Sequence, residues 1–193
     1  MPNDPRAIDA IRASLDVAQR GRLAALVLSQ MFAAQVFYHF GHYDEAVQYG
    51  MATLESEGQL LTSFRRDQVF PLAVSLVELG RLDDAVDVLD YDLGPMIPLV
   101  QRSLRAARML GFAWLLDHVG QTELVPALVG AGIDDQPAEH RDAPAFVVQR
   151  LVGGLAQLDE LVDGAASLND GDRDALLDAA RTAAAESIAA RGM

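Results

Sequence analysis

Apolar residues recur at three- and four-residue spacing along most of this chain, and single glycines interrupt the pattern at regular distances. Gly41, Gly80 and Gly120 lie 39 and 40 residues apart, and each stands between one amphipathic run and the next. This spacing is typical of helices with one buried face, and glycine readily adopts the left-handed backbone that ends a helix. The pattern predicts an all-α fold in which three helix–turn–helix units are stacked.

These runs predict where the helices lie. A short first helix begins at Pro5 and ends before Gly21, because proline suits the first turn of a helix and glycine its end. Pro126 cannot lie deep within a helix, so it is expected to begin the last helix of the third unit. Residues 132–143 are rich in Gly, Asp, Pro and Glu and are predicted to form a loop. The other helices are predicted over about 22–40, 44–57, 62–79, 82–89 and 99–119.

The C-terminal part of the chain has a different pattern. A turn is predicted at 169–171, followed by an alanine-rich helix over about 172–190. We expect residues 1–137 to form the repeat array and residues 138–193 a C-terminal helical hairpin, the two together making one globular unit. The hairpin is expected to cap the array or to form a homodimer surface. A narrow apolar seam precedes the turn and consists of Val148, Leu151, Leu155, Leu158 and Val162.

Aligning the three units on their glycines brings further positions into register. Seven residues before each glycine stands a small residue, and four residues before it stands a large apolar one. A small residue lets two helix backbones approach closely, and a large residue fills the space beside them. The aligned positions are Ala34, Ala73 and Ala113, and Phe37, Leu76 and Leu116.

The segment 34–46, Ala-Gln-Val-Phe-Tyr-His-Phe-Gly-His-Tyr-Asp-Glu-Ala, resembles the tetratricopeptide (TPR) repeat. The resemblance covers about residues 22–137, although the family period is about 34 residues. It implies a TPR-like α-solenoid of stacked antiparallel helix pairs, whose first helices line a concave groove for a peptide or a helix. Transferred by position, the groove residues are Met31, Gln35, Tyr38, His39, Phe70, Val74, Val77, Glu78, Leu110, Trp114, Asp117 and His118. The alternative interpretation places the aromatic residues of this set in the core.

Composition narrows the classes of function. The net charge of −13 argues against a nucleic-acid partner, because attraction to phosphate requires a positive field. The chain has no cysteine, which excludes disulfides and fits a cytoplasmic location. Residues 23–43 carry no formal charge, but their serine, glutamine and histidine side chains argue against a membrane span. All 15 basic residues are arginines, since the sequence contains no lysine.

Few residues are candidates for chemistry. His39 and His42, followed by Asp44 and Glu45, have a spacing that metal ligands can have. However, His39 and His118 occupy the same aligned position, which favours a structural role at a helix end. We therefore expect no enzyme, no metal and no cofactor.

Charged clusters have structural and functional interpretations. Arg102, Arg105 and Arg108 form a basic stripe, either a solvated face paired with acids or a patch for carboxylates or phosphates. The acidic clusters 83–87 and 134–135 are expected to cap helices or to face solvent.

The sequence thus predicts a non-enzymatic protein–protein interaction module with a protein or peptide partner. Two alternatives stay open. Phe37–Phe40, followed by Asp44–Ala46, is also similar to the end of the recognition helix in TetR-type repressors, although the glycine turn and basic residues of that motif are missing. A small molecule bound within the bundle near Phe70 and Trp114 is the other alternative.

Overall fold

The computed structural model describes residues 5–21, 23–56, 62–93, 97–136, 150–151 and 155–191. Within these ranges all regular secondary structure is helical, so the all-α prediction is confirmed. The named helices are α1 (Pro5–Ala18), α2 (Leu23–His39), α3 (Tyr43–Leu54), α4 (Thr62–Glu78), α5 (Leu82–Leu89), α6 (Pro98–His118), α7 (Val125–Asp134), α9 (Leu155–Ala165) and α10 (Asp170–Arg191).

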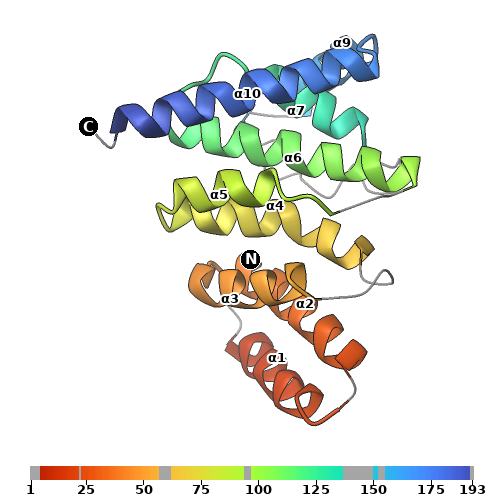
Figure 1. Ribbon diagram of the computed structural model, residues 1–193, viewed down its shortest axis with the longest axis vertical. Helices are drawn as coiled ribbons and strands as arrows, with labels where there is room; N and C mark the ends of the chain where they lie inside the picture. Colours follow the sequence, from red (N-terminus) through yellow and green to blue (C-terminus); the bar gives the residue numbers. More distant parts are fainter. Residues whose placement is uncertain are drawn as a thin grey trace.

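The helices are layered along the long axis of the molecule, from α1 at one end to α10 at the other (Figure 1). Helix α4 occupies the middle and contacts α2, α3, α5 and α6. Helix α3 lies between α2 and α4, and α7 packs against α6. The first helices of the three predicted units therefore lie side by side in the order α2, α4, α6.

The three aligned glycines end α2, α4 and α6 in the same way. Gly41, Gly80 and Gly120 have φ angles of 75°, 73° and 79°, a left-handed conformation that side chains with a Cβ atom rarely adopt. At the first turn, His42 N donates to Phe37 O at 2.9 Å and Gly41 N to Tyr38 O at 3.1 Å. This is the Schellman pair of hydrogen bonds, which satisfies the last carbonyls of the helix. Equivalent pairs follow α4 and α6, so the predicted turns are confirmed.

The aligned apolar positions are all buried. The three alanines are at most 2% exposed, and Phe37, Leu76 and Leu116 at most 1%. Close helix contacts also occur at glycines other than the three aligned ones. A Cβ atom at Gly130 of α7 would lie 2.5 Å from the carbonyl oxygen of Leu161 in α9. The predicted core positions are thus buried, and α9 approaches α7 closely at Gly130.

The structure corrects two predicted boundaries. Residues 132–134 belong to α7 rather than to a loop, and residues 137–143 lie outside the described part of the chain. Helix α10 begins at Asp170 instead of 172, because Asn169 acts as its N-cap. Asp172 N donates to Asn169 Oδ1 at 3.0 Å, while Asn169 N donates to Asp172 Oδ2 at 3.1 Å. Two reciprocal hydrogen bonds of this kind form a capping box. Because Gly171 favoured a turn, the sequence did not suggest that a helix begins here.

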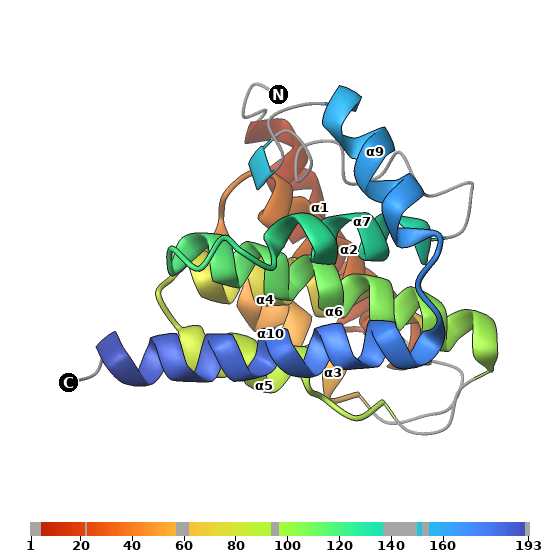
Figure 2. The same cartoon turned by 90° about the horizontal axis from the view of Figure 1, so that it is seen from above.

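The C-terminal helices do not form the predicted packed hairpin. Among the described residues, α9 contacts α7, whereas α10 contacts α5, α6 and α7. Figure 2 shows the two helices diverging from their connection. The described seam residues Leu151, Leu158 and Val162 pack against the core, and Val148 lies outside the described residues. The seam is therefore used within the chain, where α9 packs against α7.

The sequence argued against a membrane span over residues 23–43, and helix length and hydropathy bear on this prediction. In the described ranges, none of the helices combines the length and the apolar character needed to cross a bilayer.

Candidate partner-binding face

The structure divides the predicted groove residues into two groups. One group is buried in the core: Met31, Tyr38, Val74, Val77, Leu110 and Trp114, each at most 8% exposed. The others remain at least partly accessible: Gln35, His39, Phe70, Glu78, Asp117 and His118. The prediction of an apolar groove is therefore corrected for the first group. Because neighbouring helices lie in contact, these side chains fill the space between them rather than lining an open channel.

Aromatic side chains account for part of this burial. The ring of Tyr38 in α2 lies 6.5 Å from that of Phe70 in α4, in an edge-to-face arrangement, and 5.2 Å from that of His39. Burial raises the pKa of Tyr38 well above its ordinary range, and the nearby Tyr43 and Glu78 raise it further. The aromatic residues between α2 and α4 are thus chiefly structural, as the alternative interpretation of the sequence proposed.

Glu78, at the C-terminal end of α4, connects the second unit to the third and to the C-terminal part of the chain. Trp114 Nε1 in α6 donates a hydrogen bond to Glu78 Oε1 at 3.0 Å. Arg150 Nη1 donates to the same oxygen at 3.1 Å. The guanidinium carbon of Arg150 lies 3.9 Å from the centre of a Trp114 ring, which is within cation–π distance. Helices α4 and α6 therefore place an anionic group, Glu78, beside the aromatic ring of Trp114.

Arg150 was not among the predicted site residues. It lies within the apolar seam, between Val148 and Leu151, and no spacing relates it to Glu78, from which it is separated by 72 residues in sequence. A single arginine among apolar residues has no distinguishing pattern. Only the fold brings its side chain to Trp114.

The arginine stripe is structural rather than a free basic patch. Arg105 Nε donates to Asp135 Oδ2 at 2.6 Å, and Arg105 Nη2 donates to Asp170 Oδ1 at 2.6 Å. Although burial works against its charge, these hydrogen bonds raise the pKa of Arg105 above its ordinary value. Arg108 Nη2 donates to the carbonyl oxygen of Tyr91 at 2.8 Å. The stripe is thus paired with acids and a carbonyl, and Arg102 also reaches Asp135 at 3.4 Å.

The acidic residues at 134–135 were expected to cap a helix or to face solvent, but Asp135 is buried in an ion pair. Its side chain is 1% exposed and lies 3.3 Å from Arg173 Nη1 in α10. Arg173 is itself 4% exposed, and it donates to the carbonyl oxygens of Ala131 and Ala165 and to Asp134 Oδ2. A buried pair with all its hydrogen bonds satisfied connects α6, α7 and α10.

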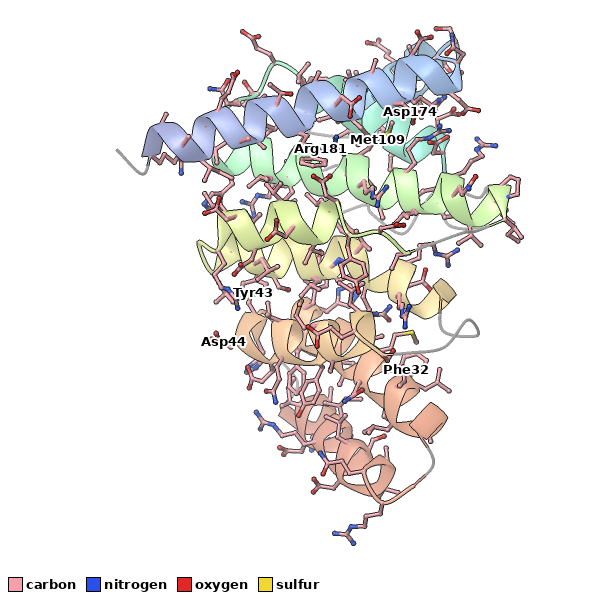
Figure 3. All side chains as sticks on the ribbon, in the orientation of Figure 1. Phe32, Tyr43, Asp44, Met109, Asp174 and Arg181 are labelled. Atoms are coloured by element: carbon pink, nitrogen blue, oxygen red, sulfur yellow. The ribbon has the colours of Figure 1, made fainter. Side chains whose placement is uncertain are left out.

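A second, more exposed contact fastens α10 to α5. Arg181 Nε lies 2.8 Å from both carboxylate oxygens of Asp90, and Arg181 Nη1 donates to Asp178 at 2.7 Å. Arg181 and Asp174 are labelled on α10 in Figure 3, where they lie along the helix that crosses the array. Asp174 is 3.7 Å from Arg105, so α10 carries ionic contacts to both α5 and α6.

The histidines do not assemble a metal site in the described part of the chain. His42 Nδ1 is 3.9 Å from Glu45 Oε2, but no third ligand-type side chain joins them there. His39 and His118 are exposed at the ends of α2 and α6, and His140 lies outside the described residues. The acidic cluster at 83–87 contains one close ion pair, in which Arg81 Nε donates to Asp84 at 2.6 Å.

Comparisons with known proteins add no relative: no family model, curated protein or solved structure matches this chain.

Proposed function

We propose that this protein is a non-enzymatic interaction module with TPR-like stacked helix pairs, which binds a peptide or a helix of a partner protein. The observation that carries the proposal is the shared position of three polar side chains. His39, Glu78 and His118 each lie two residues before a left-handed glycine, at the ends of α2, α4 and α6. Because these helices are neighbours, one face presents a row of polar groups at repeating intervals.

The layer beneath this row supports a binding role. Tyr38, Val77 and Trp114 are buried among the same helix ends and hold the exposed residues on a packed base. A rigid base lowers the conformational entropy lost when a partner binds. Gln35 and Asp117 lie on the same helices and add further hydrogen-bonding groups at the rim. We call His39, Glu78, His118, Gln35 and Asp117 the polar face.

The acidic character of the chain favours a partner with positive charge. The net charge is −13, and the polar face includes two carboxylates, Glu78 and Asp117. Complementary charge speeds association and selects against acidic competitors. A basic segment of a protein is therefore the expected occupant of this face.

The test is capture of a partner from native lysate by the wild-type chain and two variants. The face variant is Gln35→Ala/His39→Ala/His118→Ala, which changes accessible side chains and leaves the core intact. Tyr38 and Trp114 are unsuitable targets, because truncating buried aromatic residues leaves cavities that destabilise the fold.

The matched control is Gln48→Ala/Asp87→Ala/Glu123→Ala, which changes exposed residues that are not on the ends of α2, α4 or α6. We expect one protein to be retained by the wild type and the control and lost by the face variant. Retention by all three chains, with circular dichroism showing that each is folded, would contradict the proposal.

A further inference from the structure

A carboxylate and an indole ring form a preassembled pair on two neighbouring helices of the polar face. The hydrogen bond from Trp114 Nε1 fixes the carboxylate of Glu78 beside the ring. Trp114 is 4% exposed, whereas the side chain of Glu78 is 22% exposed and remains accessible to solvent. Glu78 ends α4 and Trp114 lies within α6, so two packed helices hold the pair in place.

This pair holds a guanidinium group in the present structure. Arg150 stacks over the Trp114 ring at 3.9 Å and donates to Glu78 Oε1 at 3.1 Å. A planar cation that stacks on a ring and hydrogen-bonds a carboxylate is better suited to this geometry than the compact ammonium of lysine. The contacts of Arg150 therefore identify the ligand chemistry that the pair accepts.

The occupant is held weakly. The side chain of Arg150 is 43% exposed, and ion pairs at this exposure contribute little to stability. By contrast, the hydrogen bond between Trp114 and Glu78 joins two packed helices and does not itself involve Arg150. A second arginine with the same chemistry can thus replace Arg150 without disturbing the helices that carry the site.

We propose that the Glu78–Trp114 pair binds an arginine side chain of a partner peptide, and that Arg150 is an intramolecular competitor for the same site. The inference rests on the proposed function, because it names the partner residue that the polar face recognises. Binding would exchange one guanidinium for another at the same carboxylate and ring. The apparent affinity for the peptide would then depend on how often Arg150 leaves.

The local electrostatics agree with a cationic ligand. The negative charge of Glu78 reaches two neighbouring phenols, because it contributes to the raised pKa of both Tyr38 and Tyr43, in each case after burial. Arg150 acts in the opposite direction on both groups. Loss of Arg150 therefore leaves an anionic site beside an aromatic ring.

The experiment uses the only tryptophan in the sequence as its signal, because Trp114 is itself part of the site. The probe is the blocked peptide acetyl-Gly-Arg-Gly-amide at low ionic strength, compared with its lysine and citrulline analogues. We expect Arg150→Gln to change the fluorescence of Trp114 and to bind the arginine peptide about tenfold more tightly than the wild type, because the competitor is removed. The lysine peptide should bind more weakly, and the neutral citrulline peptide should not bind.

Two further variants make the outcome decisive. Glu78→Gln should abolish binding of the arginine peptide, whereas Glu45→Gln, which alters a glutamate paired with Arg12 at 3.3 Å on the first unit, should not. Unchanged fluorescence and affinity in Arg150→Gln, or equal binding of the lysine and arginine peptides, would overturn the proposal.

The two proposals fail in different ways. A partner that is lost by the face variant but kept by Glu78→Gln would leave the interaction function standing and refute the arginine site. In the opposite case, the arginine peptide binds as expected, but the face variant still retains the partner from lysate. That result would refute the wider polar face instead.

Discussion

Arg105 Nε in α6 lies 2.6 Å from Asp135 Oδ2, just after the end of α7. The side chain of Asp135 is only 1% exposed. Arg173 approaches the other oxygen of Asp135 at 3.3 Å from α10. One buried carboxylate is therefore shared by arginines from two helices that are distant in sequence. Asp135 is thus one of the residues that hold the third unit and the C-terminal helix together.

Substitution of Asp135 by asparagine should strongly destabilise the protein. The change removes one of the two carboxylates beside Arg173, the other being Asp134, and also the buried partner of Arg105. Arg173 is 4% exposed and cannot easily return to water. Breaking a buried pair on one side costs about 3–5 kcal/mol. Urea unfolding followed by circular dichroism would measure the loss. The exposed Asp87→Asn is the control and should stay within about 0.5 kcal/mol of the wild type; equal effects of the two changes would show that Asp135 is not buried as described.

Stability should fall as the pH rises above 10. The sequence contains no lysine or cysteine, so its four tyrosines are the only side chains that ordinarily titrate near this pH. The pKa of Tyr38 is raised above its ordinary value of 10.0, chiefly by burial, so the unfolded chain loses this proton before the folded chain does. A raised pKa of this kind contributes stability that is complete below pH 10 and decreases as the pH rises toward the folded value.

The measurement is the free energy of unfolding in urea between pH 8 and 11, for the wild type and Tyr38→Phe. We expect the wild type to lose up to about 1.4 kcal/mol per pH unit from this one group above pH 10, and the variant to show a shallower decrease. Parallel curves for the two chains would contradict the role assigned to Tyr38. Absorbance of tyrosinate near the unfolding transition gives an independent signal.

Alanine at Gly80 should destabilise the array, whereas alanine at Gly164 should not. A Cβ atom has open space at both positions, so the two substitutions differ in backbone conformation alone. Gly80 has a φ of 73°, where alanine costs about 1–2 kcal/mol, while Gly164 lies in α9, where alanine gains about 0.5–1 kcal/mol. Thermal unfolding of both variants tests the pair. Equal melting temperatures would be inconsistent with the left-handed turn.

Alanine at Gly130 should loosen α9 from α7. Its Cβ atom would meet the carbonyl oxygen of Leu161 at 2.5 Å, and backbone cannot move aside as a flexible side chain can. Overpacking of this kind costs about 1–3 kcal/mol. Hydrogen exchange should become faster in α9 but not in α3, which lies in the first unit. Unchanged protection of α9 would mean that the two helices can separate slightly without losing contact.

The repeating part of the fold could be predicted because its cause is local. Glycine readily adopts the left-handed turn that ends a helix, and Gly41, Gly80 and Gly120 identified the ends of α2, α4 and α6 correctly. The alanines and large apolar residues at fixed distances before them are buried as expected. These features are set by positions within about two turns of helix.

The remaining features depend on pairs that are far apart in sequence. Asp135 and Arg173 look like ordinary surface charges until α10 is placed across α7, and each then compensates the other. Arg150 meets Glu78 by the same long-range packing. The predicted groove residues Val74 and Leu110 are buried because neighbouring helices lie too close to leave a channel. Spacing indicates which face of a helix is apolar, but it does not indicate how much of that face its neighbours cover.

The ionic contact between Arg181 and Asp90 has a consequence for the order in which the chain can fold during synthesis. Helix α5 has eight residues and leaves the ribosome early, but one of its contacts is supplied by α10, some ninety residues later. Helices α1 to α4 can pair as they emerge, because their contacts lie close in sequence. Helices α5 and α6 differ in this respect: until residue 181 has been translated, they expose the surface that α10 will cover.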